Sequence, residues 1–405
     1  MKTILFTFLF FTTLQAIEKI GLQVRLVPSG KILYEQNEHE KFIPASTLKL
    51  LTLATALHKL GPSYRFETKV YYDGNLYIKG SGDPSFSVHD LDDLAGQIKQ
   101  LVKKPIKNII IDDSVFDKNY YGQDWLEEDY DRRFSAPISG INVNYNRLVV
   151  GSLPDQKIIL DPYTKFIKLR TKKSGDYTIT GLGLDIKGKV QKLTAPQYKT
   201  YAIKEPIAWA GLLFKEALER IGIKITGVIK AGAVPENLNP ITRDFSPYLS
   251  EMGINYTKFS NNLGNEALLK TLGAGNFEQG LEVVKKFVDI ETLADASGLS
   301  RTNLVTPDQM ADFLVKTASN FKIAPEFMAA LPIGGEDGTL SRSFNKEPFK
   351  GNVRAKTGHM SGIRGLAGYY RRPDGKIVAF ALFANEIEKN ADKLKSWLEL
   401  ILNKL

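Results

Sequence analysis

The stretch that decides the fold is Pro44-Ala45-Ser46-Thr47-Leu48-Lys49, which opens the apolar run Leu50–Leu57. It predicts a loop that enters a buried helix, and the helix is expected to end at Gly61-Pro62, a glycine followed by a helix breaker. Ser46 and Lys49 share one face in the first turn of such a helix. A serine becomes a strong nucleophile when a base takes its proton, and burial or a second cation prepares a lysine for that role. The alternative is a serine that caps the helix beside a solvated lysine.

The length and composition are those of a multidomain globular protein with one unusual end. The chain has 405 residues, of which 43% are hydrophobic and 24% charged, so two or three domains are expected. Met1-Lys2-Thr3 is followed by the apolar run Ile4–Phe11 and a small, polar exit at Thr12–Ala16. Because that run is too short to span a bilayer, residues 1–16 are predicted to be a cleaved export signal.

The absence of cysteine and the net charge indicate the cellular compartment in which the protein is expected to act. The sequence has no cysteine, which excludes disulfides, thiolate catalysis and cysteine zinc sites. An exported chain without disulfides fits a bacterial periplasm or cell surface. The formal net charge of +9 favours a polyanionic setting such as the cell wall or a membrane surface. No basic block with interleaved aromatic residues occurs, so nucleic acid is not an expected partner.

The pattern of predicted secondary structure changes twice along the chain, near Tyr64 and near Tyr256. Before the first, a β-hairpin precedes the buried helix; between them short strands dominate; after the second, helices lead to a strand-turn-strand-helix ending. Strands are predicted at Gln23–Val27, Lys31–Tyr34, Phe66–Tyr72, Asn75–Lys79, Ile106–Asp112, Val353–Thr357, Gly365–Tyr370 and Ile377–Ala384. Helices are predicted at Leu91–Leu101, Ile207–Ile221, Leu263–Leu272, Phe277–Val288, after the Thr306-Pro307 start signal, and around Leu394–Leu405, whose apolar face should pack on the sheet.

A second chemical motif, Lys356-Thr357-Gly358, stands at the end of a predicted strand. The glycine would let a ligand backbone approach the strand edge closely. Lys356 and Thr357 offer a cation and a hydroxyl to a carboxylate. Taken alone, the motif is also compatible with an edge-strand lysine beside a turn.

Three motifs follow one another in the chain: Ser46-x-x-Lys49, Ser260-x-Asn262 and Lys356-Thr357-Gly358. They fall respectively at a buried helix start, in a loop before a helix and at a strand end. In this combination the chain resembles the penicillin-binding proteins and serine β-lactamases. The resemblance narrows to the D-alanyl-D-alanine carboxypeptidase/endopeptidase family of large low-molecular-mass penicillin-binding proteins. Further stretches that carry it are Gly82-Asp83-Pro84, Ser260-Asn261-Asn262-Leu263, Ser297-Gly298-Leu299-Ser300-Arg301 and Asp337-Gly338-Thr339-Leu340.

The resemblance implies a multidomain fold of the α+β or α/β class. A penicillin-binding transpeptidase/β-lactamase-like domain, an antiparallel sheet flanked by helices, would consist of residues 17–64 and 251–405. A β-rich insertion at residues 65–250, expected to form two nested accessory domains, would interrupt it. The spacing agrees, since Ser46 and Ser260 are 214 residues apart whereas Ser260 and Lys356 are only 96 apart.

The resemblance also implies catalytic roles for five residues. Ser46 would attack the carbonyl of the penultimate D-Ala, with Lys49 as its base. Ser260 would bridge Lys49 and Lys356 and relay a proton to the leaving amine. Asn262 would orient Lys49 and bind the substrate amide.

Three further residues are expected to bind substrate. Lys356 and Thr357 would hold the terminal carboxylate, with Gly358 beside them, and the backbone N–H groups of Ser46 and His359 would form the oxyanion hole. His359 departs from the family pattern, in which a small hydroxyl residue usually follows the Lys-Thr-Gly motif.

The expected activity is that of an exported serine D,D-peptidase that cleaves peptidoglycan stem peptides, without cofactor or metal, and is acylated by β-lactams. It would be periplasmic, with at most peripheral membrane contact. Two alternatives stay open: a serine β-lactamase, and a catalytically idle scaffold that binds the cell wall. The absence of His-Glu-x-x-His and Gly-x-Ser-x-Gly patterns disfavours a zinc peptidase and an α/β-hydrolase. Asp112, Asp113 and Asp117 fit a strand-end acidic turn better than a metal site.

Overall fold

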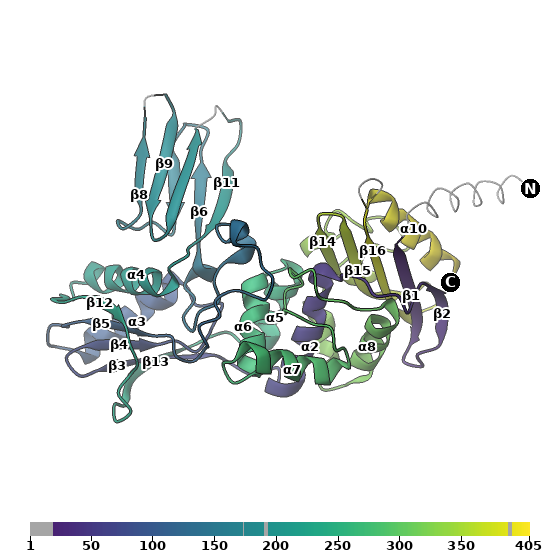
Figure 1. Cartoon of the computed structure of the whole chain (residues 1–405), viewed down its shortest axis with the longest axis horizontal. Coiled ribbons are helices and arrows are strands. Elements are labelled where there is room, and N and C mark those ends of the chain that lie inside the picture. Colours follow the sequence, from purple (N-terminus) through teal and green to yellow (C-terminus); the bar gives the residue numbers. More distant parts are fainter. Residues whose placement is uncertain (1–18, 173, 190–192, 388–390) are drawn as a thin grey trace, which may run out of the picture. The chain divides into compact units, whose positions relative to one another are not determined.

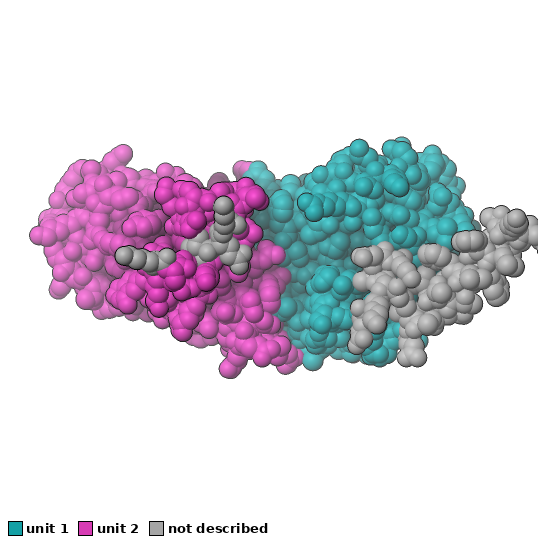
Figure 2. Space-filling view, turned by 90° about the horizontal axis from the view of Figure 1, so that it is seen from above, with its two compact units in different colours: residues 1–62, 249–261, 281–405 teal, residues 63–248, 262–280 magenta. Residues whose placement is uncertain are grey.

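The computed structural model describes residues 19–172, 174–189, 193–387 and 391–405, so the expected export signal at 1–16 lies outside the described residues. The chain forms two compact units, coloured separately in Figure 2. Among the described residues, unit 1 covers 19–62, 249–261, 281–387 and 391–405, and unit 2 covers 63–172, 174–189, 193–248 and 262–280. Within the described ranges, no helix is both long and apolar enough to cross a membrane.

A five-stranded antiparallel sheet forms the centre of unit 1, in the order β14-β15-β16-β1-β2. Strand β1, from the start of the chain, lies beside β16, from its end, with Val24 opposite Phe380. The predicted N-terminal hairpin and the predicted C-terminal strands therefore build one sheet. The strands are β1 (Ile20–Val27), β2 (Ile32–Gln36), β14 (Val353–Met360), β15 (Ile363–Arg371) and β16 (Ile377–Asn385).

Helices cover both faces of this sheet (Figure 1). On one face, α10 (Ala391–Lys404) buries an apolar stripe that includes Trp397 and Leu398 in the sheet core, which confirms the packing predicted for the final helix. On the other face, α8 (Pro307–Ser319) packs on β1 and β16, and the 3-10 helix η1 (Ala45–Leu48) packs on β14 and β15. The predicted start of α8 is confirmed, since the Thr306 hydroxyl accepts a hydrogen bond from the Gln309 N–H.

Helix α2 (Lys49–Leu60) continues η1 into the interior of unit 1 and ends at Gly61, as the sequence predicts. Every residue from Lys49 to Leu57 is buried, because α2 packs among η1, α5 (Leu249–Lys258) and α9 (Ala324–Ala330). The first nine residues of α2 are therefore shielded from solvent, and Lys49 is among them.

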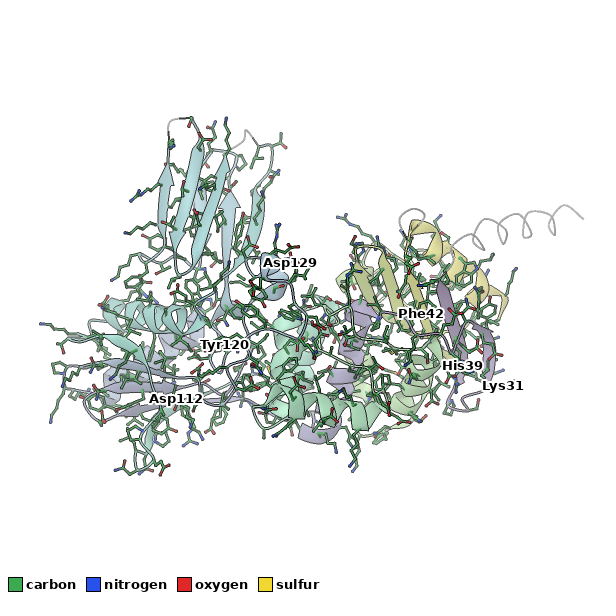
Figure 3. All side chains as sticks on the ribbon, viewed as in Figure 1. Lys31, His39, Phe42, Asp112, Tyr120 and Asp129 are labelled. Carbon is green, nitrogen blue, oxygen red and sulfur yellow. The ribbon has the colours of Figure 1, made fainter. Side chains whose placement is uncertain are left out.

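Unit 2 contains a five-stranded mixed sheet in the order β12-β5-β4-β3-β13. Strands β4 and β5 are parallel and are connected through α3 (Val88–Leu101), while β12 lies parallel to β5. Helices α3 and α4 (Pro206–Arg220) pack against each other and against the sheet. The sheet strands are β3 (Glu67–Tyr72), β4 (Leu76–Lys79), β5 (Ile109–Asp112), β12 (Ile229–Ala231) and β13 (Pro240–Phe245). Asp112, at the end of β5, is labelled in Figure 3.

Two three-stranded antiparallel sheets, β11-β6-β7 and β10-β9-β8, supply the remaining strands of unit 2. They are β6 (Arg147–Ser152), β7 (Ile158–Asp161), β8 (Lys168–Thr171), β9 (Asp176–Gly181), β10 (Leu184–Lys189) and β11 (Gln197–Ala202). Unit 2 also holds α6 (Asn262–Leu272), and α7 (Phe277–Val288) begins in it. The α+β class expected from the sequence is confirmed.

Candidate active site

Ser46 and Lys49 lie at the junction between η1 and α2. The structure places Lys49 Nζ 2.8 Å from Ser46 Oγ, so the two side chains share one face as predicted. Lys49 is fully buried. Ala45, directly before the serine, has a φ of +47°, a backbone conformation that residues with a side chain adopt only when their surroundings enforce it. Ser46 is therefore presented by a strained turn at the start of a buried helix.

The loop at residues 295–301 provides those surroundings. Its buried Asp295 carboxylate accepts hydrogen bonds from the N–H groups of Gly298, Leu299 and Ser300, which folds the loop around one carboxylate. The Ser297 carbonyl in turn accepts a hydrogen bond from Lys49 Nζ at 2.5 Å. In the sequence, residues 297–301 served only as part of the family resemblance and this direct contact was not predicted, because a backbone carbonyl has no residue-type signal.

Gly298 is needed where the loop meets the serine turn. Its φ is +76°, and a Cβ atom at this position would overlap the Ala45 carbonyl. Only glycine therefore lets the loop press against the strained residue before Ser46.

Lys356 and Gly358 face Ser46 from β14. Lys356 is fully buried and donates a hydrogen bond to the Thr357 carbonyl at 2.7 Å. Burial, and after it the positive charge of Lys49, hold the pKa of the Lys356 ammonium well below its ordinary value. A Cβ atom on Gly358 would lie 2.6 Å from the Pro44 carbonyl and 3.3 Å from the Ser46 nitrogen, so glycine allows the strand to reach the serine turn.

The outer edge of β14 offers backbone groups to a ligand. β14 is the last strand of its sheet, and the Ala355 N–H points away from β15 to bond the Pro332 carbonyl. Because N–H directions alternate along a strand, the N–H groups of Thr357 and His359 point to that same outer side. The Thr357 hydroxyl lies 2.9 Å from the hydroxyl of Thr339, which belongs to the Asp337–Leu340 stretch.

That stretch also connects β14 with the segment before Ser260. Asp337 forms an ion pair with Lys258, at the end of α5, and Gly338 packs against the Lys258 carbonyl. Two residues later Ser260 is half-buried and has a φ of +56°, so it is strained in the same way as Ala45. The sequence prediction gave Asp337 no role, since its partner is 79 residues away.

Asn262 begins α6 and belongs to unit 2. Its Nδ2 donates a hydrogen bond to the Phe134 carbonyl at 2.8 Å. Unit 1 thus brings together Ser46, Lys49 and the Lys356–Gly358 motif, whereas the side-chain amide of Asn262 is anchored within unit 2.

The acidic turn after β5 has structural partners. Asp112 accepts hydrogen bonds from the N–H groups of Ser114 and Val234, and Asp113 accepts them from Lys118 and Tyr120. Asp117 accepts one from the N–H of Phe277. In the part of the chain that the structure describes, no group of three or more His, Cys, Asp or Glu side chains is arranged to hold a metal ion.

Comparisons with known proteins agree with this geometry. The model of the D-Ala-D-Ala carboxypeptidase 3 (S13) family matches residues 13–398. A D-alanyl-D-alanine carboxypeptidase from Actinomadura sp. (strain R39) is 30% identical over 417 residues, which cover 90% of this chain and 77% of the relative.

Solved structures show the same fold. The crystal structure of penicillin binding protein 4 from Haemophilus influenzae has a TM-score of 0.77 at 23% identity, covering 95% of this chain and 94% of that one. The same protein complexed with a novel β-lactam has a TM-score of 0.72 at 22% identity, with 95% of each chain covered.

The family match spans nearly the whole chain, and the relative from Actinomadura carries the carboxypeptidase name at substantial coverage. The transpeptidase-like sheet flanked by helices, expected from the three motifs, is the fold of the solved relative. The chain belongs to the D-Ala-D-Ala carboxypeptidase 3 (S13) family and is a serine D-Ala-D-Ala carboxypeptidase.

Proposed function

We propose that Ser46 is the nucleophile and that Lys49 is its base. The observation that carries this proposal is the fully buried Lys49 amine at 2.8 Å from the Ser46 hydroxyl. Ser46 Oγ attacks the carbonyl of the penultimate D-Ala while Lys49 takes the hydroxyl proton. The bond to the terminal residue breaks, and its amine leaves with a proton from the site. Water then cleaves the Ser46 ester and restores the free serine.

The base must be a neutral amine, and the second lysine favours that state. Lys356 is buried, and the charge of Lys49 contributes to the lowering of its pKa. Repulsion between two ammonium groups is mutual, so the pair favours the state in which one of them has lost its proton. Of the two lysines, Lys49 is the one beside the Ser46 hydroxyl. In the neutral state it can therefore accept the hydroxyl proton.

The edge of β14 would position the substrate. Lys356 and Thr357 bind the terminal carboxylate, and Gly358 lets the substrate backbone come close. The outward N–H of His359 and the N–H of Ser46 form the oxyanion hole, where the loss of one donor typically costs on the order of 10²–10³ in rate. Ser260 relays the proton to the leaving amine, and Asn262 orients Lys49 and binds the substrate amide.

The natural substrate in this proposal is the D-Ala-D-Ala end of a peptidoglycan stem peptide, together with D-Ala–meso-diaminopimelate cross-links. The leader-like pattern of residues 1–16 supports export to the periplasm, where that substrate is found. The β-lactam complex of the Haemophilus relative supports the binding of β-lactams, which would acylate Ser46 in this proposal. We keep residues 65–250 as a proposed insertion of two nested accessory domains within a catalytic domain of residues 17–64 and 251–405.

Two other functions can be separated from this one. A serine β-lactamase would share the acylation step but release the drug quickly. A wall-binding scaffold would form no adduct at all. The extensive unit 2 favours the peptidase over the lactamase, since a small antibiotic needs no accessory structure.

The deciding experiment is intact mass spectrometry of residues 17–405 after brief exposure to benzylpenicillin, beside Ser46→Ala. We expect one long-lived penicilloyl adduct on the wild type and none on the variant. Rapid drug consumption without a lasting adduct would favour the lactamase. A folded protein that forms no adduct and consumes no drug would support the scaffold.

A further inference from the structure

Asp295 is a buried carboxylate that the proposed reaction does not use, and it is only 2% exposed. The loop that follows it folds around its two oxygens. Oδ1 accepts a hydrogen bond from the Gly298 N–H at 2.8 Å, and Oδ2 accepts hydrogen bonds from the N–H groups of Leu299 and Ser300, each at 2.9 Å. The Ser297 hydroxyl also donates to Oδ2, at 3.0 Å. Three consecutive N–H groups that converge on one carboxylate hold the peptide groups of this loop in a single orientation.

Asn303 holds the same carboxylate from the other end of the loop. This residue is fully buried. Its Nδ2 donates hydrogen bonds to Asp295 Oδ1 and to the Ser300 carbonyl, both at 2.9 Å, and its Oδ1 accepts one from the Ala294 N–H at 2.8 Å. The Asp295 carboxylate is therefore the centre on which both ends of the loop are fixed.

This loop presents two carbonyls to α2. The Ser297 carbonyl accepts a hydrogen bond from Lys49 Nζ at 2.5 Å, and the Ala296 carbonyl lies 3.5 Å from the hydroxyl of Thr52, one turn later on the same helix face. Lys49 Nζ also lies 2.8 Å from Ser46 Oγ. A neutral amine has two N–H donors and one lone pair in a tetrahedral arrangement. The hydrogen bond to the Ser297 carbonyl therefore restricts rotation of the amine and leaves its lone pair free to face the Ser46 hydroxyl.

From these contacts we infer that Asp295 is a positioning residue for the base: it holds the Ser297 carbonyl, and that carbonyl holds Lys49 Nζ in the orientation that takes the serine proton. The inference rests on the proposed function, in which Lys49 is the base. When Ser46 Oγ loses its proton, Lys49 Nζ gains it and becomes an ammonium. The Ser297 carbonyl accepts a hydrogen bond from that ammonium too, so it stabilises the positive charge as the charge develops. Asp295 acts on the reaction through the peptide group of Ser297.

The test removes the charge of Asp295 and keeps the shape of its side chain. In Asp295→Asn one oxygen becomes an NH2 group, which cannot accept hydrogen bonds from the N–H groups of the loop. A buried donor that faces another donor is costly, so the loop should rearrange and withdraw the Ser297 carbonyl from Lys49. The first-order rate constant of acylation at saturating benzylpenicillin should fall roughly 10²-fold, the order typical of a misplaced catalytic group, while the drug concentration for half-saturation stays near the wild-type value. Stopped-flow measurements across drug concentrations separate the two constants.

The pH dependence of the acylation rate constant distinguishes positioning of Lys49 from a general loss of structure. The Ser297 carbonyl and the negative charge of Asp295 both favour the protonated lysine, so in Asp295→Asn the lysine should lose its proton at a lower pH. The acid limb of the rate profile should therefore move to lower pH, although its plateau is lower. Lys356, whose charge also acts on this lysine, is the same in both proteins. A sample that merely contains less folded enzyme would keep the wild-type midpoint.

Thr306→Ala is the control for stability. It removes the hydroxyl that caps α8 in the same unit, so it destabilises the fold without changing the Asp295 carboxylate. Its acylation rate constant and pH midpoint should equal those of the wild type. Asn303→Ala repeats the test at the other end of the loop with the carboxylate retained, and it should lower the same rate constant. It decides the question if Asp295→Asn does not fold.

Circular dichroism and denaturant unfolding establish that each variant is folded. If the wild type itself forms no penicilloyl adduct, the proposed function fails. If the wild type is acylated but folded Asp295→Asn reacts at the wild-type rate, or slows with an unchanged pH midpoint, Asp295 is not a positioning residue. A wild-type rate for Asn303→Ala, where only that variant folds, would refute the inference in the same way.

Discussion

Unit 2 buries one lysine, Lys270, completely, and unit 1 buries Lys356 together with Lys49; Lys270 and Lys356 differ in what they face. In unit 2, Lys270 forms an ion pair with Asp117 at 2.8 Å and donates a hydrogen bond to the Asn119 carbonyl at 2.6 Å. In unit 1, Lys356 donates to a carbonyl of its own strand and faces the charge of a second lysine, Lys49. The first arrangement compensates a buried charge, whereas the second leaves it under repulsion.

The pKa shifts report the same difference. Burial lowers the pKa of Lys270, but its hydrogen bond and charge interaction with Asp117 oppose that shift. Burial lowers the pKa of Lys356 too, and the neighbouring cation adds to the shift instead of opposing it. A buried lysine that forms an ion pair with a carboxylate thus has a structural role. A buried lysine that lies beside another cation is a candidate for a catalytic role.

The largest effect is expected when the base is replaced by a side chain that cannot lose its proton. Arginine is not deprotonated in proteins, so Lys49→Arg places a permanent cation beside Ser46 that cannot accept the hydroxyl proton. The second-order rate constant of acylation by benzylpenicillin should fall roughly 10³–10⁴-fold. Stopped-flow or quenched mass spectrometry measures it, with Lys270→Arg as the control that stays near the wild-type rate. A near-normal rate for Lys49→Arg would remove Lys49 from the base role.

Next in size is the loss of the structural lysine. Lys270→Met leaves the Asp117 carboxylate without its ion-pair partner, and breaking a buried pair in this way typically costs about 3–5 kcal/mol of unfolding free energy. Denaturant unfolding of the variant measures the loss. The double variant Lys270→Met/Asp117→Asn should recover part of it, because no unpaired charge then remains. A single variant as stable as the wild type would mean that the ion pair does not compensate the buried charge.

The local features of the fold and of the candidate site could be predicted from the sequence. The spacing of Ser46 and Lys49 fixed their common face, and the Thr306-Pro307 signal located the start of α8. The Lys356 motif was correctly placed on a strand, although β14 continues to Met360. Such features depend on residues within one or two turns of one another, so residue type and spacing carry the information.

The remaining parts depend on contacts between distant segments. Helix α5, just before Ser260, was not predicted, and its packing against α2 and α9 is what stabilises it. The parallel pairing of β4 with β5 was missed as well, since strand direction depends on the path through α3. No residue pattern indicates that the Ser297 carbonyl meets Lys49, or that Ala45 has a positive φ, because both follow from how the loop at 295–301 packs.

A smaller expected effect is a pH dependence of the unfolding free energy that originates in unit 2. In unit 2, Asp83 is buried, and that burial, with the nearby charges of Asp90 and Asp244, raises its pKa to about 6 although Ser85 donates two hydrogen bonds to it. The folded state therefore holds its proton up to a higher pH than the unfolded chain does, whose Asp titrates near 3.8. Stability is lost as the pH rises from about 4 through about 6, by about 2–3 kcal/mol for this group.

Asp83→Asn keeps the Oδ1 acceptor for Ser85 and removes the charge. Above pH 6 the variant should be more stable than the wild type, and its stability should change less between pH 5 and pH 8, with Asp244 supplying the slope that remains. Thermal unfolding at the two pH values measures both quantities. An unchanged pH dependence would assign the slope to other groups.

The smallest expected effect is a gain in stability, opposite in sign to the loss expected for Lys270→Met. Lys356→Met replaces a buried ammonium under repulsion by an apolar side chain of similar length, so at pH 6 the variant should be more stable than the wild type by about 1–2 kcal/mol. Because the folded-state pKa is lowered, the wild type regains stability as the pH rises from that pKa towards 10.5, the value of an ordinary lysine. The advantage of the variant should therefore shrink when unfolding is measured at pH 9, while cleavage of D-Ala-D-Ala peptides stays impaired at both pH values. A variant less stable than the wild type at pH 6 would mean that Lys356 is compensated as well as Lys270, and the contrast between the two buried lysines would be lost.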